Sequence, residues 1–320
     1  MLTERVAGLT DEPTLASALA AAFERLHPAP PPVPERLVAL PVPVAGPRTL
    51  VVAGPGVLHA GAIGVTGLRA LAAMTGAPVV NTFGAKGVLR WDDPAHAGTA
   101  GLQRDDFSLA GVPDADLVVT TGLDPDEARG LFLDPARTID VPPAHLRFAA
   151  GGWPPPAAPP ARPELYARLA AVVGPMYAGE GHPVPPPRAA AALAGRGLVV
   201  ADPGPAGFWV ARTFPTTEPG SVIVPARPSP GFAVAAAMVA ALEGRAAVAV
   251  TTGPLGGVSL GLLDIARSHA LPVVLQVWSE SGDRPAAADA AGRSVVESVA
   301  VDWSVLESLV AVAGPVVAWT

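Results

Sequence analysis

Residues 49–81, TLVVAGPGVLHAGAIGVTGLRALAAMTGAPVVN, carry a complete pattern of strand, helix and strand. The β-branched run at residues 49–53 predicts a buried strand that stops at a Gly-Pro-Gly turn. Residues 60–75 predict a helix, and residues 77–81 predict the next strand. Apolar strands that alternate with helices are typical of a parallel sheet covered on both faces.

The same alternation continues through two blocks of the chain. Further strands are predicted at residues 116–121, 137–141, 197–201, 246–251, 271–277 and 315–319. Further helices are predicted at residues 12–26, 230–242, 260–269 and 302–313. Thr10 or Asp11 is the expected N-cap of the first of these helices. We therefore predict an α/β protein with two doubly wound parallel-sheet domains.

Proline-rich stretches at residues 28–34, 153–163 and 182–188 indicate where the blocks are joined. The predicted boundaries give an N-terminal helix with a linker (1–47), a Rossmann-like domain (48–152), a proline-rich linker with a helix (153–190) and a second α/β domain (191–320).

Composition excludes several classes of protein. Half of the 320 residues are hydrophobic and 15% are charged, which excludes disorder for lack of core material. The longest apolar run, residues 232–242, is well short of the roughly 20 residues that cross a bilayer. The first residues have no apolar run of the signal-peptide type. We expect a cytoplasmic protein with no membrane partner.

Cysteine is absent, which excludes disulfides, iron–sulfur clusters and thiolate catalysis. The net charge of −7 argues against a nucleic-acid partner. The six histidines lack zinc-site spacing, although His96 follows Asp92 and Asp93 closely. Lys86 is the only lysine and Asn81 the only asparagine.

The turn between the first strand and the first helix of the middle block contains Gly54 and Gly56. Backbone N–H groups at such a turn can bind a phosphate. The turn has no third glycine at dinucleotide spacing and no acid at the end of the next strand. A turn that only joins strand to helix is therefore favoured, and a bound nucleotide remains the alternative.

Four stretches resemble one enzyme family in their order. They are TFGAKG (82–87), DADLVVTTG (114–122), PGFAVAAAMVAAL (230–242) and LPVVLQVWSE (271–280). With the helix at residues 12–26, they resemble the thiamine-diphosphate-dependent enzymes of the acetolactate synthase and 2-oxo-acid decarboxylase type. Those enzymes have pyrimidine-binding, central and diphosphate-binding domains. The resemblance implies that residues 1–47 end the first domain, residues 48–152 form the second and residues 191–320 form the third.

The resemblance also implies a magnesium diphosphate site, from which this chain departs. In the family, a Gly-Asp-Gly turn and a later Asn hold Mg²⁺ together with diphosphate oxygens. Here Gly253, in Thr252-Gly253-Pro254, falls on the Asp, and Ser279 falls on the Asn. Glu280 is a possible substitute ligand, but a surface acid is the favoured interpretation. We therefore expect no metal ligand.

Two more departures concern the cofactor. The family places a bulky apolar residue before the glycine that opens the alanine-rich helix, whereas Pro230 precedes Gly231 here. The glutamate that activates thiamine lies in the part of the first domain that this chain does not match. We expect no catalytic residue. The positions expected to contact a cofactor, if one binds, are Gly231, Thr252, Gly253, Ser279, Gly54 and Gly56.

These features predict a degenerate relative that does not catalyse by itself and has a structural, regulatory or ligand-binding role. The alternative is one half of a split 2-oxo-acid decarboxylase or carboligase, in which a separate pyrimidine-domain subunit completes a site for thiamine diphosphate and Mg²⁺. A diphosphate-binding domain without its usual neighbour would expose an apolar face. We therefore expect a homo-oligomer, as a dimer or tetramer, or a pyrimidine-domain partner.

Overall fold

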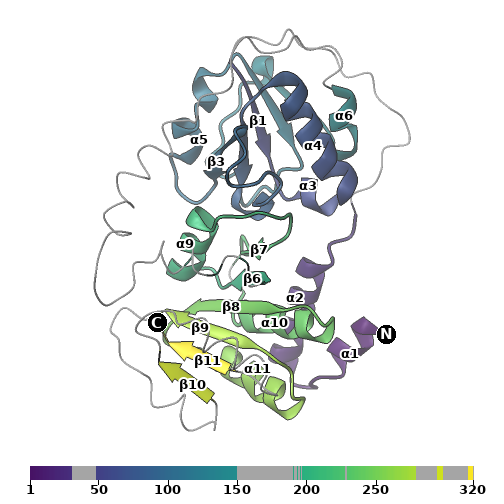
Figure 1. Cartoon of the computed structure of the whole chain (residues 1–320), viewed down its shortest axis with the longest axis vertical. Helices are drawn as coiled ribbons and strands as arrows, with labels where there is room; N and C mark the ends of the chain where they lie inside the picture. Colours follow the sequence, from purple (N-terminus) through teal and green to yellow (C-terminus); the bar gives the residue numbers. More distant parts are fainter. Residues whose placement is uncertain are drawn as a thin grey trace. The chain divides into compact units, whose positions relative to one another are not determined.

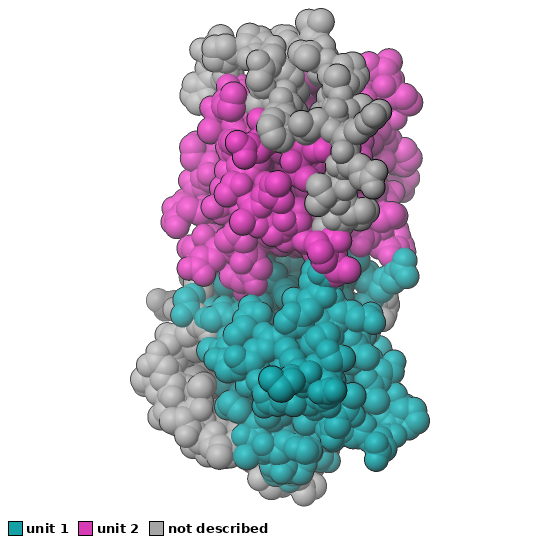
Figure 2. Space-filling model, turned by 90° about the vertical axis from the view of Figure 1, so that its right-hand side faces the viewer, with its two compact units in different colours: residues 1–28, 175–214, 222–320 teal, residues 29–174, 215–221 magenta. Residues whose placement is uncertain are grey.

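The computed structural model describes residues 1–30, 48–149, 190, 193, 195, 197–227, 229–278, 294–297 and 316–319. The chain forms two compact units, coloured separately in Figure 2. Unit 1 comprises Met1–Pro28, Pro175–Phe214 and Val222–Thr320, and unit 2 comprises Ala29–Gly174 and Pro215–Ser221. The predictions for residues 153–189, for Ser279 and Glu280, and for a helix at 302–313 lie outside the described residues. The predicted domain boundaries stay predictions.

Unit 2 contains a five-stranded parallel sheet of order β3-β2-β1-β4-β5 (Figure 1). Its strands are β1 (Thr49–Ala53), β2 (Val79–Thr82), β3 (His96–Ala100), β4 (Leu117–Thr121) and β5 (Thr138–Asp140). The chain builds the sheet outward from β1, first through β2 to one edge and then through β4 to the other. The sheet therefore reverses its strand order between β1 and β4.

Both faces of this sheet are buried. Its helices are α3 (Gly56–His59), α4 (Ala62–Thr75), α5 (Asp106–Leu109) and α6 (Leu146–Ala149). Leu50 and Val52 of β1 belong to a buried cluster that includes Phe107 of α5. The alternate residue Val51 belongs to a second cluster that includes Leu68 of α4. Successive side chains of a strand point to opposite faces, so these clusters confirm the predicted two-sided core.

Unit 1 contains a six-stranded parallel sheet of order β10-β11-β9-β8-β6-β7. Its strands are β6 (Leu198–Ala201), β7 (Val222–Ile223), β8 (Ala247–Thr252), β9 (Val274–Trp278), β10 (Ser294–Glu297) and β11 (Val316–Trp319). Its helices are α1 (Leu2–Ala7), α2 (Pro13–Leu26), α9 (Pro205–Thr213), α10 (Phe232–Leu242) and α11 (Gly257–Ser268). The strand order reverses between β6 and β8, which makes unit 1 doubly wound as well.

The two parallel sheets confirm the predicted α/β class. The helices and strands that the sequence analysis missed are short or rich in small residues, and they are α1, α3, β3, α5, α6, α9, β7 and β10. In β3, His-Ala-Gly-Thr-Ala lacks the apolar run that identifies a buried strand. No described helix combines the length and apolarity needed to span a membrane.

The predicted N-cap of the helix at residues 12–26 is wrong. Glu12 is the N-cap of α2, and its carboxylate accepts hydrogen bonds from the N–H groups of Thr14 (3.1 Å) and Leu15 (2.7 Å). Thr10 instead accepts a bond from the N–H of Glu12 at 3.1 Å. The longer Glu side chain reaches the free N–H groups of the first turn, which short cap residues more often satisfy.

Candidate functional site

The reversal of strand order in unit 1 places two loops at the carboxyl ends of β6 and β8. In open parallel sheets, ligands bind in the crevice outside the carboxyl ends at this reversal. The first loop contains Asp202 and Gly204, and the second runs from Gly253 to Gly256. This edge is the candidate functional site of unit 1.

Asp202 joins three elements at this edge. Its Oδ1 accepts a hydrogen bond from the N–H of Ala233 in the first turn of α10 (2.8 Å), and its Oδ2 accepts one from the hydroxyl of Thr251 on β8 (2.7 Å). Burial raises the pKa of the Asp202 carboxyl, against the opposing effect of these two hydrogen bonds. The carboxyl group thus fixes the end of β6 to β8 and to the N-terminus of α10.

Thr252 and Gly253 connect the end of β8 to α9 and to β9. The Thr252 hydroxyl accepts a hydrogen bond from the N–H of Ala206 in the first turn of α9 (3.0 Å). The N–H of Gly253 donates to the carbonyl of Trp278 at 2.9 Å and so extends the pairing of β8 with β9. Gly204, which precedes α9, has φ 138°, a conformation that glycine adopts without a steric penalty.

The turn that follows β8 leaves space around its glycines. A Cβ added to Gly256 or to Gly257 would have no heavy atom within 4 Å. Gly231 differs, because its added Cβ would lie 2.8 Å from Val258 Cγ1 and 3.0 Å from Leu262 Cδ1. Gly231 therefore allows α10 and α11 to pack closely, in addition to its left-handed φ of 72° at the N-cap of α10.

Three of the predicted contact positions, Gly231, Thr252 and Gly253, thus belong to the loops and helix ends of this one edge. Ser279 lies outside the described residues. The sequence analysis missed Asp202 as a site residue. Its signal was a single acid directly after the apolar run at 197–201.

In unit 2, the backbones of two loops pack against each other outside the carboxyl ends of β1 and β4. The N–H groups of Gly54 and Gly56 donate to the carbonyls of Thr121 and Gly122, each at 2.8 Å. A Cβ added to Gly54 would lie 2.3 Å from the Gly122 carbonyl oxygen and 2.4 Å from Leu123 Cα. These two glycines bring the loops after β1 and β4 into contact. Their N–H groups are engaged there, which leaves the nucleotide interpretation without support.

A buried polar cluster lies at the ends of β2 and β3 in unit 2. Glu127 accepts hydrogen bonds from the Thr82 hydroxyl (2.5 Å) and from the Gly84 N–H (3.0 Å). A ring nitrogen of His96 lies 2.9 Å from Asn81 Oδ1, and both residues are buried. Glu127, which follows β4, thus holds the segment after β2, and His96, the first residue of β3, contacts β2. His96, singled out for its proximity to acids, therefore contacts an amide side chain.

The only lysine of the chain, Lys86, lies in the segment that follows β2. Lys86 is 1% exposed, and its Nζ lies 4.4 Å from the ring centroid of Trp91. An ammonium group at this distance from an aromatic face is in cation–π range. The side chains of Asn81 and Lys86, rare in this chain, are thus both part of the interior of unit 2.

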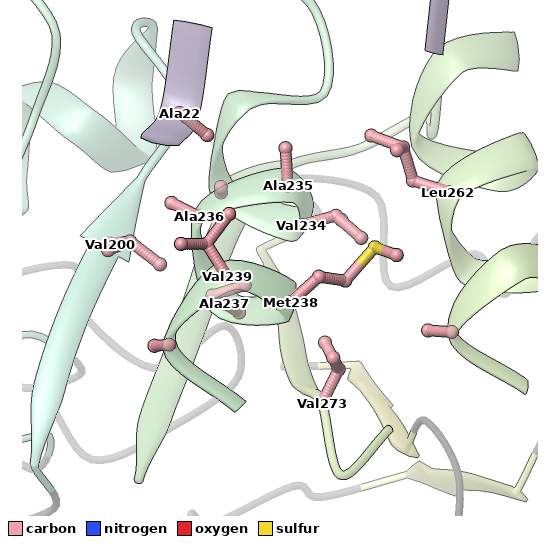
Figure 3. Packing of buried hydrophobic residues seen from close by; sticks show 14 of the residues in the cluster. Ala22, Val200, Val234, Ala235, Ala236, Ala237, Met238, Val239, Leu262 and Val273 are labelled. Carbon is pink, nitrogen blue, oxygen red and sulfur yellow. The ribbon is translucent and has the colours of Figure 1, made fainter. Parts of the chain in front are cut away.

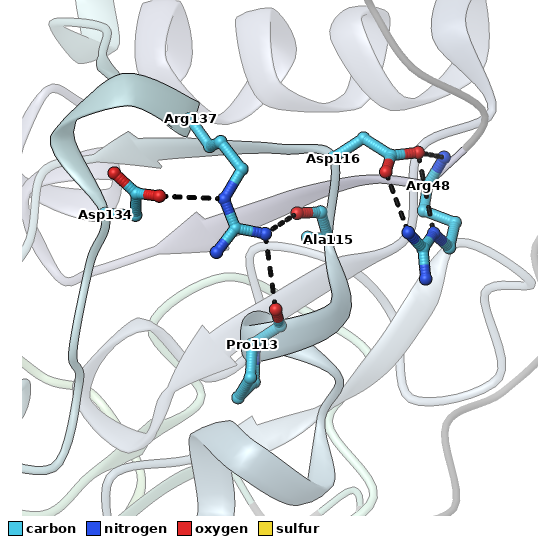
Figure 4. Close-up of polar contacts among 6 residues, drawn as sticks. All are labelled: Arg48, Pro113, Ala115, Asp116, Asp134 and Arg137. Atoms are coloured by element: carbon cyan, nitrogen blue, oxygen red, sulfur yellow. Dashed lines mark hydrogen bonds and ion pairs between the residues drawn. The ribbon is translucent and has the colours of Figure 1, made fainter.

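Charged side chains connect neighbouring segments at the amino-terminal ends of the unit 2 strands (Figure 4). Asp116 accepts bonds from the guanidinium of Arg48 (2.9 Å) and from its backbone N–H (3.1 Å). These two bonds, the guanidinium bond first, hold the pKa of Asp116 below its ordinary value. Arg137 donates to the carbonyls of Pro113 (3.3 Å) and Ala115 (2.8 Å). Both arginines fix the loop that leads into β4.

The residues at the unit 1 edge do not fit a magnesium diphosphate group. Mg²⁺ is held by carboxylate and phosphate oxygens in octahedral geometry. Residues 252–257, Thr-Gly-Pro-Leu-Gly-Gly, contain neither a carboxylate nor an amide side chain. Asp202 uses both of its oxygens within the fold. In the described part of the chain, no three His, Cys, Asp or Glu residues gather into a candidate metal site.

Comparisons with known proteins agree with this fold. Residues 45–148 match the family model of the thiamine pyrophosphate enzyme central domain. The structure resembles that of a "putative thiamin diphosphate-dependent enzyme" from Mycobacterium smegmatis, with a TM-score of 0.60 and 19% sequence identity. That match covers 95% of this chain and 64% of the other, so this chain spans less than two thirds of that protein's length. A comparison with curated protein sequences gives no match. Residues 45–148 are therefore similar to the central domain of thiamine pyrophosphate enzymes, and the structural match shows that the fold of the chain is similar as well.

Proposed function

We propose that this chain is a degenerate relative of the acetolactate synthase and 2-oxo-acid decarboxylase enzymes that does not catalyse by itself. Its role is structural, regulatory or ligand-binding. The observation that supports this proposal most directly is the turn at residues 252–257, which supplies no oxygen ligand of the kind that Mg²⁺ selects. The family resemblance places the metal-binding Asp at Gly253.

The surrounding hydrogen bonds support the same proposal. Asp202, the acid after β6, is held by Ala233 and Thr251, and burial raises its pKa. A carboxyl group that is fixed in this way serves to connect β6, β8 and α10. Moving it to bind a metal would leave the Ala233 N–H without its partner, at a cost of about 1–3 kcal/mol.

Calorimetric titration of the full chain with thiamine diphosphate and Mg²⁺ tests the proposal. We expect no saturable heat, and binding with a Kd of about 1 μM or tighter, near 8 kcal/mol, would overturn it. A double variant, Gly253→Asp with Ser279→Asn, supplies the two missing oxygen ligands and is expected to bind more tightly than the unmodified chain. Equal affinity in the two proteins would contradict the assignment of these positions.

The second candidate is one half of a split enzyme whose pyrimidine domain is a separate subunit. Its support is the match of residues 45–148 to the central domain of thiamine pyrophosphate enzymes. Its test is turnover of 2-oxo acids such as pyruvate by this chain mixed with a pyrimidine-domain protein, in the presence of thiamine diphosphate and Mg²⁺. Absence of turnover would remove this candidate, and turnover would remove the first.

A further inference from the structure

Strand β9 carries two polar side chains into the interior of unit 1. Gln276 is 1% exposed and Trp278 is 9% exposed, and we call these two residues the β9 pair. Gln276 Nε2, Gln276 Oε1 and Trp278 Nε1 are buried without a hydrogen-bond partner among the residues that the structure describes. Buried polar atoms in native proteins are nearly always hydrogen-bonded. Three exceptions on one strand point to a partner from outside the chain.

The β9 pair lies on the face of the sheet that is opposite α10. Leu275 and Val277 of β9 belong to the core cluster around α10, which Figure 3 shows from close by. Because successive side chains of a strand point to opposite faces, Gln276 and Trp278 lie on the other face. The pairing of β8 with β9 places Thr252 beside Trp278. Thr252 and the β9 pair are therefore neighbours on one face.

Helix α9 lies on this same face at the carboxyl end of β8. The hydrogen bond from the N–H of Ala206 in the first turn of α9 to the hydroxyl of Thr252, at 3.0 Å, fixes its position. The β9 pair thus belongs to the carboxyl edge of the sheet, next to the reversal of strand order between β6 and β8. In open parallel sheets this edge is where ligands bind.

The loops outside these strand ends leave space. A Cβ added to Gly204 would have one neighbour within 4 Å, the Thr252 hydroxyl oxygen at 3.9 Å, and a Cβ added to Gly256 would have none. The space beside Gly204 therefore adjoins Thr252, whose strand neighbour is Trp278. Trp278 is the last residue of β9, so a ligand that enters from this edge reaches it first and reaches Gln276 two residues further in.

The charges around the β9 pair favour a neutral ligand. Residues 247–263 and 271–278 contain no charged side chain. Asp202 uses both of its oxygens within the fold. Arg212, the one cation of α9, lies in the last turn, at the opposite end of the helix from Ala206. An anion buried here would lack a counter-charge, which is costly, so we expect a ligand without charge.

The three atoms also specify which polar groups the ligand carries. The amide of Gln276 offers an N–H donor beside a carbonyl acceptor, and the indole of Trp278 offers only an N–H donor. The complement is a ligand with an N–H group next to a carbonyl, as in a lactam. Its N–H donates to Gln276 Oε1, and the two lone pairs of its carbonyl oxygen accept from Gln276 Nε2 and Trp278 Nε1.

We propose that Gln276 and Trp278 form a binding site for a neutral cyclic amide, which enters from the carboxyl ends of β8 and β9. This inference rests on the ligand-binding role proposed above and gives that role a chemical class. It does not depend on the turn at residues 252–257, because the donors and the acceptor are side chains of β9. A buried water molecule can pair with the same three atoms, so the experiment has to distinguish water from a lactam.

Titration of the full chain with 2-pyrrolidone tests the proposal, and N-methyl-2-pyrrolidone is the matched compound without an N–H. The readout is the indole N–H signal of Trp278 in NMR spectra, assigned as the signal that Trp278→Phe removes. We expect a saturable shift with a Kd of about 1–10 mM for 2-pyrrolidone and binding at least about tenfold weaker for the methylated compound. Equal affinity for the two compounds, or no shift at about 100 mM, would leave water as the partner and overturn the proposal.

Gln276→Leu provides the test from the side of the protein. The variant keeps a side chain of similar size and removes an amide without a partner, so its denaturant midpoint should equal or exceed that of the unmodified chain while 2-pyrrolidone binding is lost. Gln103→Leu, at the only other glutamine, lies in unit 2 and should leave the binding unchanged. A lowered midpoint for Gln276→Leu would show that the fold itself uses the amide, and retained binding would show that the lactam binds elsewhere. Either result overturns the proposal.

The two proposals fail in different measurements. Absence of lactam binding removes this inference alone, because thiamine diphosphate takes no part in either readout. Calorimetric binding of thiamine diphosphate with Mg²⁺ removes the proposed function instead.

Discussion

The two sheets reverse their strand order in the same way, yet the loops at the two reversals differ. In unit 2, Gly54 and Gly56 face Gly122, and the loops touch backbone to backbone with hydrogen bonds of 2.8 Å. In unit 1, side chains of Asp202 and Thr252 connect the loops to helix ends, and the glycines of the following turn have free space. The same parallel topology is therefore compatible with close backbone packing at one reversal and with free space around the glycines at the other.

The largest expected difference in unfolding free energy is between the variants that add a methyl group at the two reversals. Gly54→Ala places a Cβ against fixed backbone in unit 2, and we expect a loss of about 3 kcal/mol or more in unfolding free energy. Gly256→Ala in unit 1 meets no neighbouring atom at a φ of −75°, and its effect should stay within about 0.5 kcal/mol. Denaturant unfolding measures both. Equal losses would show that the two edges are packed alike.

The next largest effect is expected at Asp202, whose side chain connects the loops of unit 1. Asp202→Ala leaves the Ala233 N–H and the Thr251 hydroxyl without their acceptor, and should cost about 1–3 kcal/mol. Asp202→Asn keeps an oxygen for the Ala233 N–H and should cost less. Chemical denaturation compares the two variants. A loss for Asn as large as that for Ala would mean that charge, and not hydrogen bonding, holds the edge.

The same residue predicts a pH dependence. Because burial raises the folded-state pKa of Asp202, the folded chain holds this proton more tightly than the unfolded chain. The resulting stabilisation is complete below the ordinary pKa of aspartate and is lost as the pH rises through the raised value. We expect the stability difference between the unmodified chain and Asp202→Asn to change over this window. A difference that stays constant with pH would contradict the raised pKa.

The smallest effect on stability is expected at Asp116, which pairs with the exposed Arg48 at the amino-terminal ends of the unit 2 strands. Asp116 has a lowered pKa, so its stabilisation is present above the ordinary pKa and is lost as the pH falls through the lowered value. Asp116→Asn should slightly lower the thermal midpoint at neutral pH and reduce the loss of stability in acid. Asp114→Asn, an exposed neighbour, serves as the control. An effect as large as that of Asp202→Ala would contradict the low value of exposed ion pairs.

Sequence reasoning worked best where the apolar pattern was long. The strand at residues 49–53 and the helix at residues 230–242 follow directly from runs of Val, Leu and Ala. It failed at β3 and α9, whose residues are small or mixed and are buried by tertiary contacts. The absence of a carboxylate from residues 252–257 was visible in the sequence, because it depends on residue type alone.

The glycines show the limit of such reasoning most clearly. In sequence, Gly54, Gly231 and Gly256 look alike, each before a helix. In the structure, Gly54 touches the backbone of a neighbouring loop, Gly231 lets two helices pack, and Gly256 faces open space. What surrounds a residue without a side chain is set by segments far away in sequence, so no local pattern distinguishes the three.

The sequence by itself determined the class of fold, because the alternation of apolar strands and helices is a local pattern that only a parallel α/β arrangement buries on both faces. It also determined which chemical groups are missing after β8. The tertiary structure alone decided that Asp202 joins β6, β8 and α10, and that the N-terminal helices cover α10. Both depend on contacts between distant segments, whose partners are chosen by packing of the whole unit and not by the order of neighbouring residues.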